Sequence, residues 1–397
     1  MKLLILTQYF WPENFRINDL AVELARRGHS VTVLTGTPNY PEGKVLPAFR
    51  ADPASFARLG QADIVRVPAL VRGSGYVRLV LNYRCFALSA CVFGPWKLRG
   101  RDFDLVFVYQ VSPATIGLPA VLLSHLKRAR MFFWVQDLWP DTLSAIGVIR
   151  SPLLTCLVGA FMRWVYRNSD HLFAQSRAFL PSLGQRTPAS LPVTYMPNWA
   201  YNHAACGGLP PPDPGKQGFD IYYLGNLGAA QGLPAVLDAI ELLQDAGLCW
   251  HFVGAGSAAT WLAREVERRG LGAAVRLHGA HPPQDMPLFY RQADALFVSL
   301  RPDPLFALTV PSKVSSYLAA GLPIIGMLDG EGARVIEEAG AGVTCPAGDS
   351  MALAAAVRRL RALPGQTRQA MGETGRCYYE AEFSFLQIVD QLESLLG

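Results

Sequence analysis

Short, continuous apolar segments alternate with helical patterns along nearly the whole chain of 397 residues. These segments lack the polar alternation of strands that have one face in water, and are typical of parallel strands covered by helices on both sides. The alternation predicts a doubly wound α/β architecture. The expected strands are 2–6, 30–34, 63–67, 105–109, 131–135, 171–174, 220–224, 250–253, 275–278, 295–298 and 323–326. The expected helices are 17–27, 114–127, 152–167, 177–185, 233–245, 258–269, 285–291, 312–320 and 331–338.

One segment interrupts this alternation near the middle of the chain. Residues 204–218 contain four Pro and four Gly and no apolar periodicity, which is typical of a linker. At ~100–200 residues per domain, the chain length also favours two domains. We expect domains at 1–198 and 219–382 joined by a linker at 199–218, followed by an amphipathic helix at about 383–397.

The charge is distributed unevenly between the two halves. Residues 1–198 carry 22 Lys and Arg against 11 Asp and Glu, a net +11, while residues 199–397 carry 14 against 20, a net −6. The basic half should face an anionic partner. The Arg residues are scattered and no nucleic-acid motif accompanies them, so a membrane or a phosphorylated substrate is favoured over nucleic acid. A chain with 51% hydrophobic residues is not disordered.

The segment from Leu79 to Trp96 is the most apolar stretch, and basic residues flank it. It is shorter than the ~20 apolar residues that a spanning helix needs, and fits a helix lying on a membrane or one buried in the first domain. The first residues are typical of a strand rather than a signal peptide, and the seven cysteines form no CxxC pair. We therefore expect a cytoplasmic protein, attached peripherally to the inner face of the cell membrane, with reduced thiols.

Two loops after expected strands suit phosphate. The segment from Gly225 to Gly232 offers backbone amides unhindered by side chains, and Ser312 and Lys313 place a candidate N-cap and a positive charge at the start of a helix. For Ser312 and Lys313, the alternative is a capped surface helix. Gly254 and Gly256 are a weaker signal, for which a plain strand-to-helix turn is favoured over phosphate binding. The loop at 7–14 has no glycine, which disfavours a dehydrogenase.

A third candidate follows the strand at 131–135. Asp137 and Asp141 flank Trp139 at the strand's carboxyl end, an arrangement suited to an acceptor or catalytic corner. The alternative is that Asp137 caps a turn before Pro140.

Six segments together resemble the family 4 glycosyltransferases of the GT-B fold. They are the opening LLILTQYFWPENFRINDLAVELARRGHSVTVLTG, QDLWPD, YLGNLGAAQGL, HFVGAG, ADALFVSL and VPSKVSSYLAAGLPIIG, in the family's order. The branch that builds O-antigen, capsule and colanic acid, including N-acetylfucosaminyl transferases, is the most similar. The resemblance implies two Rossmann-like domains facing across a cleft and a C-terminal helix that returns to the first domain. It also implies a nucleotide sugar on the second domain, an acceptor on the first, and no metal.

Site residues are carried over one by one. The resemblance implies catalytic roles for Asp137 and Lys313. Donor-binding roles fall on Gly225, Asn226, Gly228, Gln231, Gly254, Gly256, His281, Pro311, Ser312, Lys313 and Glu331. Acceptor-binding roles fall on Tyr9, Trp11, Glu13, Arg16, Asp137 and Trp139. Asn226 and Gln231 occupy places where many relatives have Arg and Lys, and the usual glutamate pair would fall on Leu308 and Ser316.

These observations predict a retaining glycosyltransferase that moves a sugar from a nucleotide sugar, expected to be UDP-linked, to a lipid-linked saccharide in bacterial surface polysaccharide biosynthesis. No metal or other cofactor is expected. A nucleotide-sugar epimerase of the same fold is the first alternative. A non-catalytic nucleotide-sugar-binding module is the second, because the usual Arg, Lys and Glu are replaced.

Overall fold

The computed structural model describes residues 1–40, 43–73, 76–111, 113–145, 151–200, 218–243 and 247–396. Two compact units make up the chain: unit 1 is Met1–Met196 with Gln391–Gly397, and unit 2 is Pro197–Asp390. The sequence places the first boundary after residue 198 and starts the returning helix at about 383. Most of the expected linker, 201–217, lies outside the described residues.

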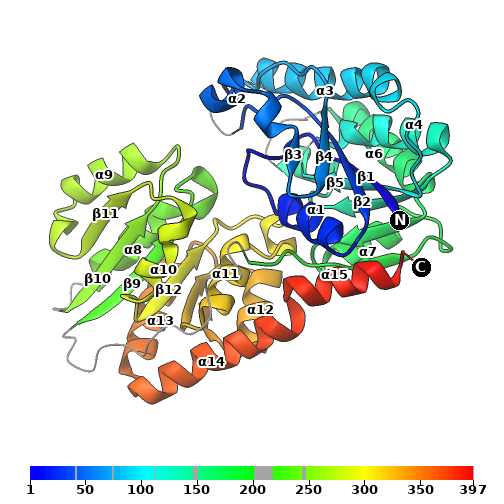
Figure 1. Cartoon of the computed structure of the whole chain (residues 1–397). Coiled ribbons are helices and arrows are strands. Elements are labelled where there is room, and N and C mark those ends of the chain that lie inside the picture. The colour runs from blue at the N-terminus through cyan, green and yellow to red at the C-terminus, as the bar shows by residue number, and fades with distance from the viewer. Residues whose placement is uncertain are drawn as a thin grey trace. The chain divides into compact units, whose positions relative to one another are not determined.

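Unit 1 is built on an eight-stranded sheet of order β3-β4-β2-β1-β5-β6-β7-β8, in which only the β3–β4 pair is antiparallel. Its strands are β1 (Lys2–Leu6), β2 (Ser30–Thr35), β3 (Arg58–Leu59), β4 (Ala62–Arg66), β5 (Leu105–Gln110), β6 (Arg130–Val135), β7 (His171–Ala174) and β8 (Val193–Tyr195). Its helices are α1 (Arg16–Arg26), α2 (Pro47–Ala51), η1 (Ala54–Phe56), α3 (Tyr76–Lys97), η2 (Ala114–Ile116), α4 (Gly117–Lys127), α5 (Asp141–Ala145), α6 (Pro152–Arg167) and α7 (Phe179–Gly184). Figure 1 shows helices on both sides of the sheet.

Unit 2 contains a six-stranded parallel sheet of order β11-β10-β9-β12-β13-β14. Its strands are β9 (Phe219–Leu224), β10 (Leu248–Val253), β11 (Val275–Gly279), β12 (Ala295–Ser299), β13 (Ile324–Met327) and β14 (Gly342–Cys345). Its helices are η4 (Ala229–Gln231), α8 (Leu233–Leu242), α9 (Ala259–Arg268), η5 (Leu271–Ala273), η6 (Pro283–Asp285), α10 (Met286–Tyr290), η7 (Phe306–Leu308), α11 (Ser312–Ala320), α12 (Glu331–Glu338), α13 (Ser350–Ala362) and α14 (Gly365–Glu382). Separate apolar clusters fill the two faces of this sheet, one under α8 and α13 and one under α11 and α12. The doubly wound architecture is confirmed in both units.

The strand orders define where ligands bind in such sheets. In unit 1 the chain reverses direction across the sheet between β1 and β5, and in unit 2 between β9 and β12. Open α/β sheets bind ligands beyond the carboxyl ends of the strands at these switch points. The loops after β1 and β5 in unit 1, and after β9 and β12 in unit 2, are therefore the places to examine, and the loop after β6 lies one strand further along the unit 1 sheet.

Helix α15 (Phe385–Ser394) contributes residues to both units. In unit 1, Glu393 lies 2.5 Å from Arg27 Nη1 and 2.8 Å from His29 Nε2. In unit 2, Phe385 packs on Trp199 with 4.8 Å between ring centroids. The apolar periodicity expected near the C-terminus thus reflects a helix whose ends pack on different partners.

Helix α3 covers the apolar segment expected at 79–96. One side is buried in unit 1 through Phe86 and Ala90, while Leu88 and Val92 remain 60% and 66% exposed. The buried face agrees with a helix packed in the first domain, and the exposed apolar face leaves the membrane interpretation a prediction. Among the described residues, none of the helices combines the length and hydropathy that crossing a bilayer requires.

Candidate functional site

Two glycine-rich loops meet at the carboxyl edge of the unit 2 sheet. Gly225, directly after β9, donates its amide to the Val253 carbonyl at 2.8 Å. Gly254, directly after β10, has φ of +149°, and a Cβ there would lie 1.9 Å from the Gly225 carbonyl oxygen. No other residue allows this approach. The two loops that the sequence associates with the donor are therefore held against each other.

Lys313, near the start of α11, lies beside these loops. Its Nζ lies 4.6 Å from the centroid of the Tyr223 ring, and a Cβ at Gly225 would lie 3.3 Å from it. Burial lowers the pKa of the Lys313 ammonium to about 8. No carboxylate that the structure describes forms an ion pair with it. A half-buried cation for which the described residues provide no counterion is suited to an anionic ligand.

The other residues predicted in these loops have more specific contacts. Gln231 is buried, and its Oε1 accepts a 2.8 Å hydrogen bond from the Gly228 amide, so its side chain shapes the loop. The Asn226 carbonyl accepts a 2.6 Å hydrogen bond from the Tyr223 hydroxyl. A Cβ at Gly256 would lie 2.6 Å from Asn226 Oδ1, which brings the second loop beside this side chain.

The expectation that Ser312 caps the helix is wrong. Pro311 is the N-cap residue, and Ser312 is the first, exposed residue of α11. Its carbonyl accepts hydrogen bonds from Ser315 and Ser316 in the first turn. Pro311 instead precedes the first turn of α11. Its ring packs close to α12, because a Cβ placed at Gly332 would lie 2.9 Å from it.

The last two predicted donor residues, Glu331 and His281, lie in different surroundings. Glu331 begins α12 and both of its carboxylate oxygens accept hydrogen bonds from Arg334, at 2.9 and 3.0 Å. His281 is exposed, 3.6 Å from Asp285, and its ring lies 4.9 Å from Phe289. Glu331 is thus already paired, while the His281 ring remains accessible.

In unit 1, Asp137 lies in the loop directly after β6. Its backbone carbonyl accepts a 3.3 Å hydrogen bond from Gln110 Nε2, which fixes the loop to the end of β5. Burial raises the pKa of the Asp137 carboxyl to about 6. The carboxylate makes no hydrogen bond or ion pair with any residue that the structure describes. A half-buried carboxyl group with a raised pKa at a strand end is a candidate for work on a substrate.

Glu13, predicted to contact the acceptor, is held between two loops of unit 1. It is 4% exposed, and its oxygens accept hydrogen bonds from the amides of Phe10, Asn39 and Tyr40 at 3.2, 2.6 and 2.6 Å. Burial raises the pKa of the Glu13 carboxyl to about 7, against the lowering effect of these amides and of Arg66. Glu13 therefore joins the loop after β1 to the loop after β2.

Three other predicted acceptor residues are buried within unit 1. Arg16 is 5% exposed, and Trp139 is 7% exposed with no hydrogen-bond partner for Nε1 among the described residues. Tyr9 is 4% exposed, and its hydroxyl lies 3.4 Å from Asn82 Oδ1 of α3. Of the predicted acceptor residues in the loop after β1, Trp11 alone is half-buried.

Sequence reasoning missed two polar residues at this edge. Arg66 ends β4, donates to the carbonyls of Trp11 and Gly36, and has its pKa lowered to about 10 by burial. Asn82 is fully buried and accepts a 2.7 Å hydrogen bond from Gln8. The sequence contains a hint of both residues, because Arg66 lies near the end of the strand expected at 63–67 and Asn82 is a polar residue within an apolar segment.

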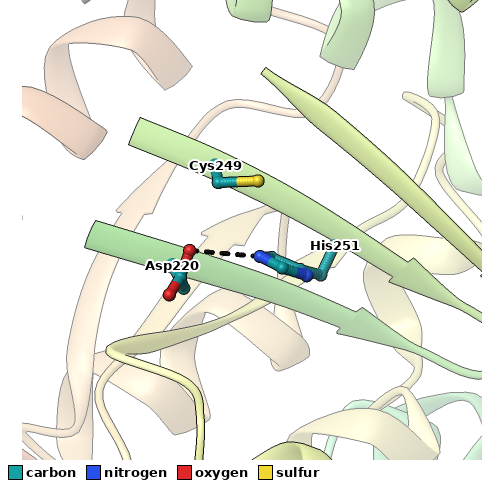
Figure 2. A group of neighbouring side chains, drawn as sticks. All are labelled: Asp220, Cys249 and His251. Atoms are coloured by element: carbon teal, nitrogen blue, oxygen red, sulfur yellow. Dashed lines mark hydrogen bonds and ion pairs between the residues drawn. The ribbon is translucent and has the colours of Figure 1, made fainter. Parts of the chain in front are cut away.

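A group of potential metal ligands lies elsewhere in unit 2 (Figure 2). Asp220 on β9 is the register partner of Cys249 on β10, and His251 follows two residues later on the same strand. The three donor atoms lie within 4.8 Å of one another, and His251 Nε2 is 3.1 Å from Asp220 Oδ1. Oxygen, nitrogen and sulfur donors suit an ion such as Zn²⁺. The cluster is near the beginning of β9, so it is separate from the loops at the strand ends.

Two family models match most of the chain. Residues 14–199 match the glycosyl transferase 4-like domain, and residues 218–362 match glycosyl transferases group 1. The chain belongs to this family of glycosyltransferases. Among curated relatives it is similar to a putative colanic acid biosynthesis glycosyl transferase, WcaI, of Escherichia coli, at 27% identity over 81% of this chain and 82% of the relative. It is also 26% identical to the probable glycosyltransferase WbjE of Pseudomonas aeruginosa, over 64% and 66% of the two chains.

Solved structures share the fold of this glycosyltransferase. Sucrose-phosphate synthase of Thermosynechococcus elongatus matches with a TM-score of 0.73 and 15% identity, over 99% of this chain and 98% of that one. HepE of Anabaena, in complex with UDP and glucose, matches with a TM-score of 0.69 and 14% identity, over 100% and 99%. WaaG, a glycosyltransferase involved in lipopolysaccharide biosynthesis, matches with a TM-score of 0.65 and 13% identity over both full chains. The predicted GT-B fold is therefore confirmed.

Proposed function

We propose that this glycosyltransferase transfers a sugar from a UDP-linked donor to a lipid-linked saccharide, in the biosynthesis of a bacterial surface polysaccharide. The observation that carries the proposal is the Lys313 ammonium, which lies against Gly225 without a carboxylate partner among the described residues. The titles of related proteins support the context: HepE is solved with UDP and with UDP-glucose, and WcaI is named for colanic acid biosynthesis.

In the proposed reaction the Lys313 ammonium binds the diphosphate of the donor, beside the loop that begins at Gly225. As the bond between the sugar and the diphosphate breaks, negative charge grows on the leaving oxygen, so Lys313 stabilises the transition state more than the ground state. We propose retention of the anomeric configuration, with attack from the face that the diphosphate leaves. The departing diphosphate then accepts the proton of the acceptor hydroxyl, and no metal is needed.

Asp137 has the proposed role of orienting the acceptor or stabilising positive charge on the sugar ring. Its carboxyl has no partner that the structure describes, which leaves both oxygens available to a ligand. The raised pKa of about 6 still leaves the group ionised at neutral pH. A carboxylate in this state accepts a hydrogen bond from a hydroxyl group.

We also propose peripheral attachment to the inner face of the cell membrane through α3. The exposed side of this helix carries Leu81, Leu88, Val92 and Trp96. A surface of this kind, flanked by basic residues, binds anionic lipid through apolar burial and charge together.

The test is release of nucleoside diphosphate by the purified full chain from a panel of nucleotide sugars, with and without a bacterial lipid extract. The proposal expects release from a UDP-sugar only when the extract is present. An epimerase would convert the donor without the extract. A binding module would bind the donor and release nothing under either condition.

A further inference from the structure

Unit 1 contains an open apolar groove beside the loop that holds Asp137. Its volume is about 410 Å³, within the roughly 300–1,000 Å³ range of small-molecule sites. The walls come from three helices, with Ala87 and Leu88 from α3, Leu118 from α4, and Leu157 and Phe161 from α6. The lining is almost wholly apolar, so the groove suits hydrocarbon rather than sugar or nucleotide.

The three helices are held in place by close packing. A Cβ at Gly117, the first residue of α4, would lie 2.5 Å from Val165 of α6. A Cβ at Gly94 of α3 would lie 3.7 Å from Leu123 of α4, in ordinary van der Waals contact. The groove is therefore a feature of packed helices, with Leu88 and Leu157 on its walls more than half exposed.

The three helices that form the groove carry charge of one sign. The sequences of α3, α4 and α6 contain no Asp or Glu. Arg84 lines the groove itself and forms no ion pair with a described carboxylate. Further positive charges on these helices are Arg78, Lys97, Lys127, Arg163 and Arg167. An occupant with an anionic group is favoured.

The groove also continues to the predicted acceptor corner. Trp139 lines it, and lies two residues after Asp137 in the same loop. Trp139 Nε1 is buried and has no hydrogen-bond partner among the described residues. A chain lying in the groove would therefore reach the loop that carries the residue proposed to act on the acceptor.

We propose that this groove binds the hydrocarbon chain of the acceptor, a single-chain lipid diphosphate, with Arg84 supplying positive charge for its phosphates. The inference rests on the proposed function and adds where the lipid part of the acceptor is recognised. A flat bilayer would contact the protruding leucines of α3 and α6 but leave the groove unfilled. A chain that enters the groove removes both the leucines and its own carbons from water.

The experiment measures calorimetric binding of isoprenyl diphosphates of one, two and three isoprene units to the full chain. Affinity should rise about tenfold or more from the shortest to the longest, because each buried CH₂ contributes about 0.8 kcal/mol when it is fully removed from water. The matched variants are Leu157→Ser in the groove and Leu153→Ser on α6, which is 69% exposed and does not line the groove. Of these two leucine variants, only Leu157→Ser should weaken binding of the longest ligand, by about fivefold or more, on the scale of one or two buried CH₂ groups. Arg84→Gln should weaken all three ligands equally.

Equal affinity for the three chain lengths, or equal effects of the two leucine variants, would overturn the inference. Phosphatidylglycerol vesicles distinguish a bilayer contact from a groove: if vesicle binding falls with Leu157→Ser while isoprenyl diphosphate binding does not, the face binds membrane and the groove is not the site. The assay uses no sugar donor. A protein that does not transfer sugar could therefore still bind longer isoprenyl diphosphates more tightly. A protein whose groove does not bind the lipid could still transfer sugar.

Discussion

Replacement of Lys313 by Met should change stability and ligand binding in opposite directions. Met keeps the apolar length of the side chain beside Tyr223 and removes the charge. Burial lowers the pKa of Lys313 from 10.5 to about 8, a difference that corresponds to roughly 3 kcal/mol of unfavourable free energy for the buried ammonium. The free energy of unfolding of the variant should therefore rise at pH 7, by up to about that amount.

The same substitution should reduce sugar transfer. Loss of one charge-stabilising donor costs about 3 kcal/mol in a transition state, so kcat/KM should fall by roughly 100-fold or more. Gln231→Ala should cost less, because that side chain contacts the Gly228 amide and carries no charge. Wild-type kcat/KM should also fall as pH rises through about 8, where the Lys313 ammonium loses its proton.

Urea denaturation at pH 7 and steady-state kinetics of Lys313→Met and Gln231→Ala are the measurements. Lys313→Met with full activity would refute a diphosphate role for this residue. A severe Gln231→Ala beside a mild Lys313→Met would reverse the ranking of the two. A Lys313→Met protein that loses activity and is also less stable than the wild type would show that Lys313 has a stabilising partner, contrary to the unpaired cation described above.

Three further predictions concern unit 1. Asp137→Asn should lower turnover by about 100-fold or more, the range for loss of a catalytic carboxylate, with UDP affinity by calorimetry unchanged; unchanged turnover would make Asp137 a turn residue. Glu13 has a pKa raised to about 7 in the folded state, so its contribution to stability is present below pH 4.5 and lost as pH rises to 7; Glu13→Gln should flatten that part of the urea-denaturation profile, and an unchanged slope would contradict the burial argument. Pelleting with anionic vesicles should decrease as salt rises, because each basic residue near the surface contributes about 1 kcal/mol that salt screens, whereas equal pelleting with neutral vesicles would remove the electrostatic part of membrane attachment.

Much of the fold was predictable because the core strands are continuous apolar segments. β5 and β6 are buried at almost every residue, and both agree with expectation within a residue. Two of the elements missed are of a different kind. β8 is short and only half-buried, and α14 is a polar helix with three internal or terminal glycines that obscure its periodicity.

The site was predictable to the level of loops but not of contacts. Strand ends and glycines locate the loop after β9 that is proposed to lie beside the donor, and the start of α11 locates Lys313. The partners of Glu13 could not be inferred, because Asn39 and Tyr40 come from a loop 26 and 27 residues away whose path depends on tertiary packing. The N-cap of α11 was misjudged because Pro311, with φ of −58°, already provides the entry into the helix.

The central claim is transfer of a sugar from a nucleotide diphosphate to a lipid. The most direct measurement follows a radiolabelled sugar from a UDP-sugar into the butanol-extractable lipid of a bacterial membrane extract, with the wild type, Asp137→Asn and Lys313→Met compared. The account predicts label in the lipid fraction with the wild type, in amounts equal to the UDP released, and little with either variant. Label that stays in the aqueous fraction while UDP is released would contradict it.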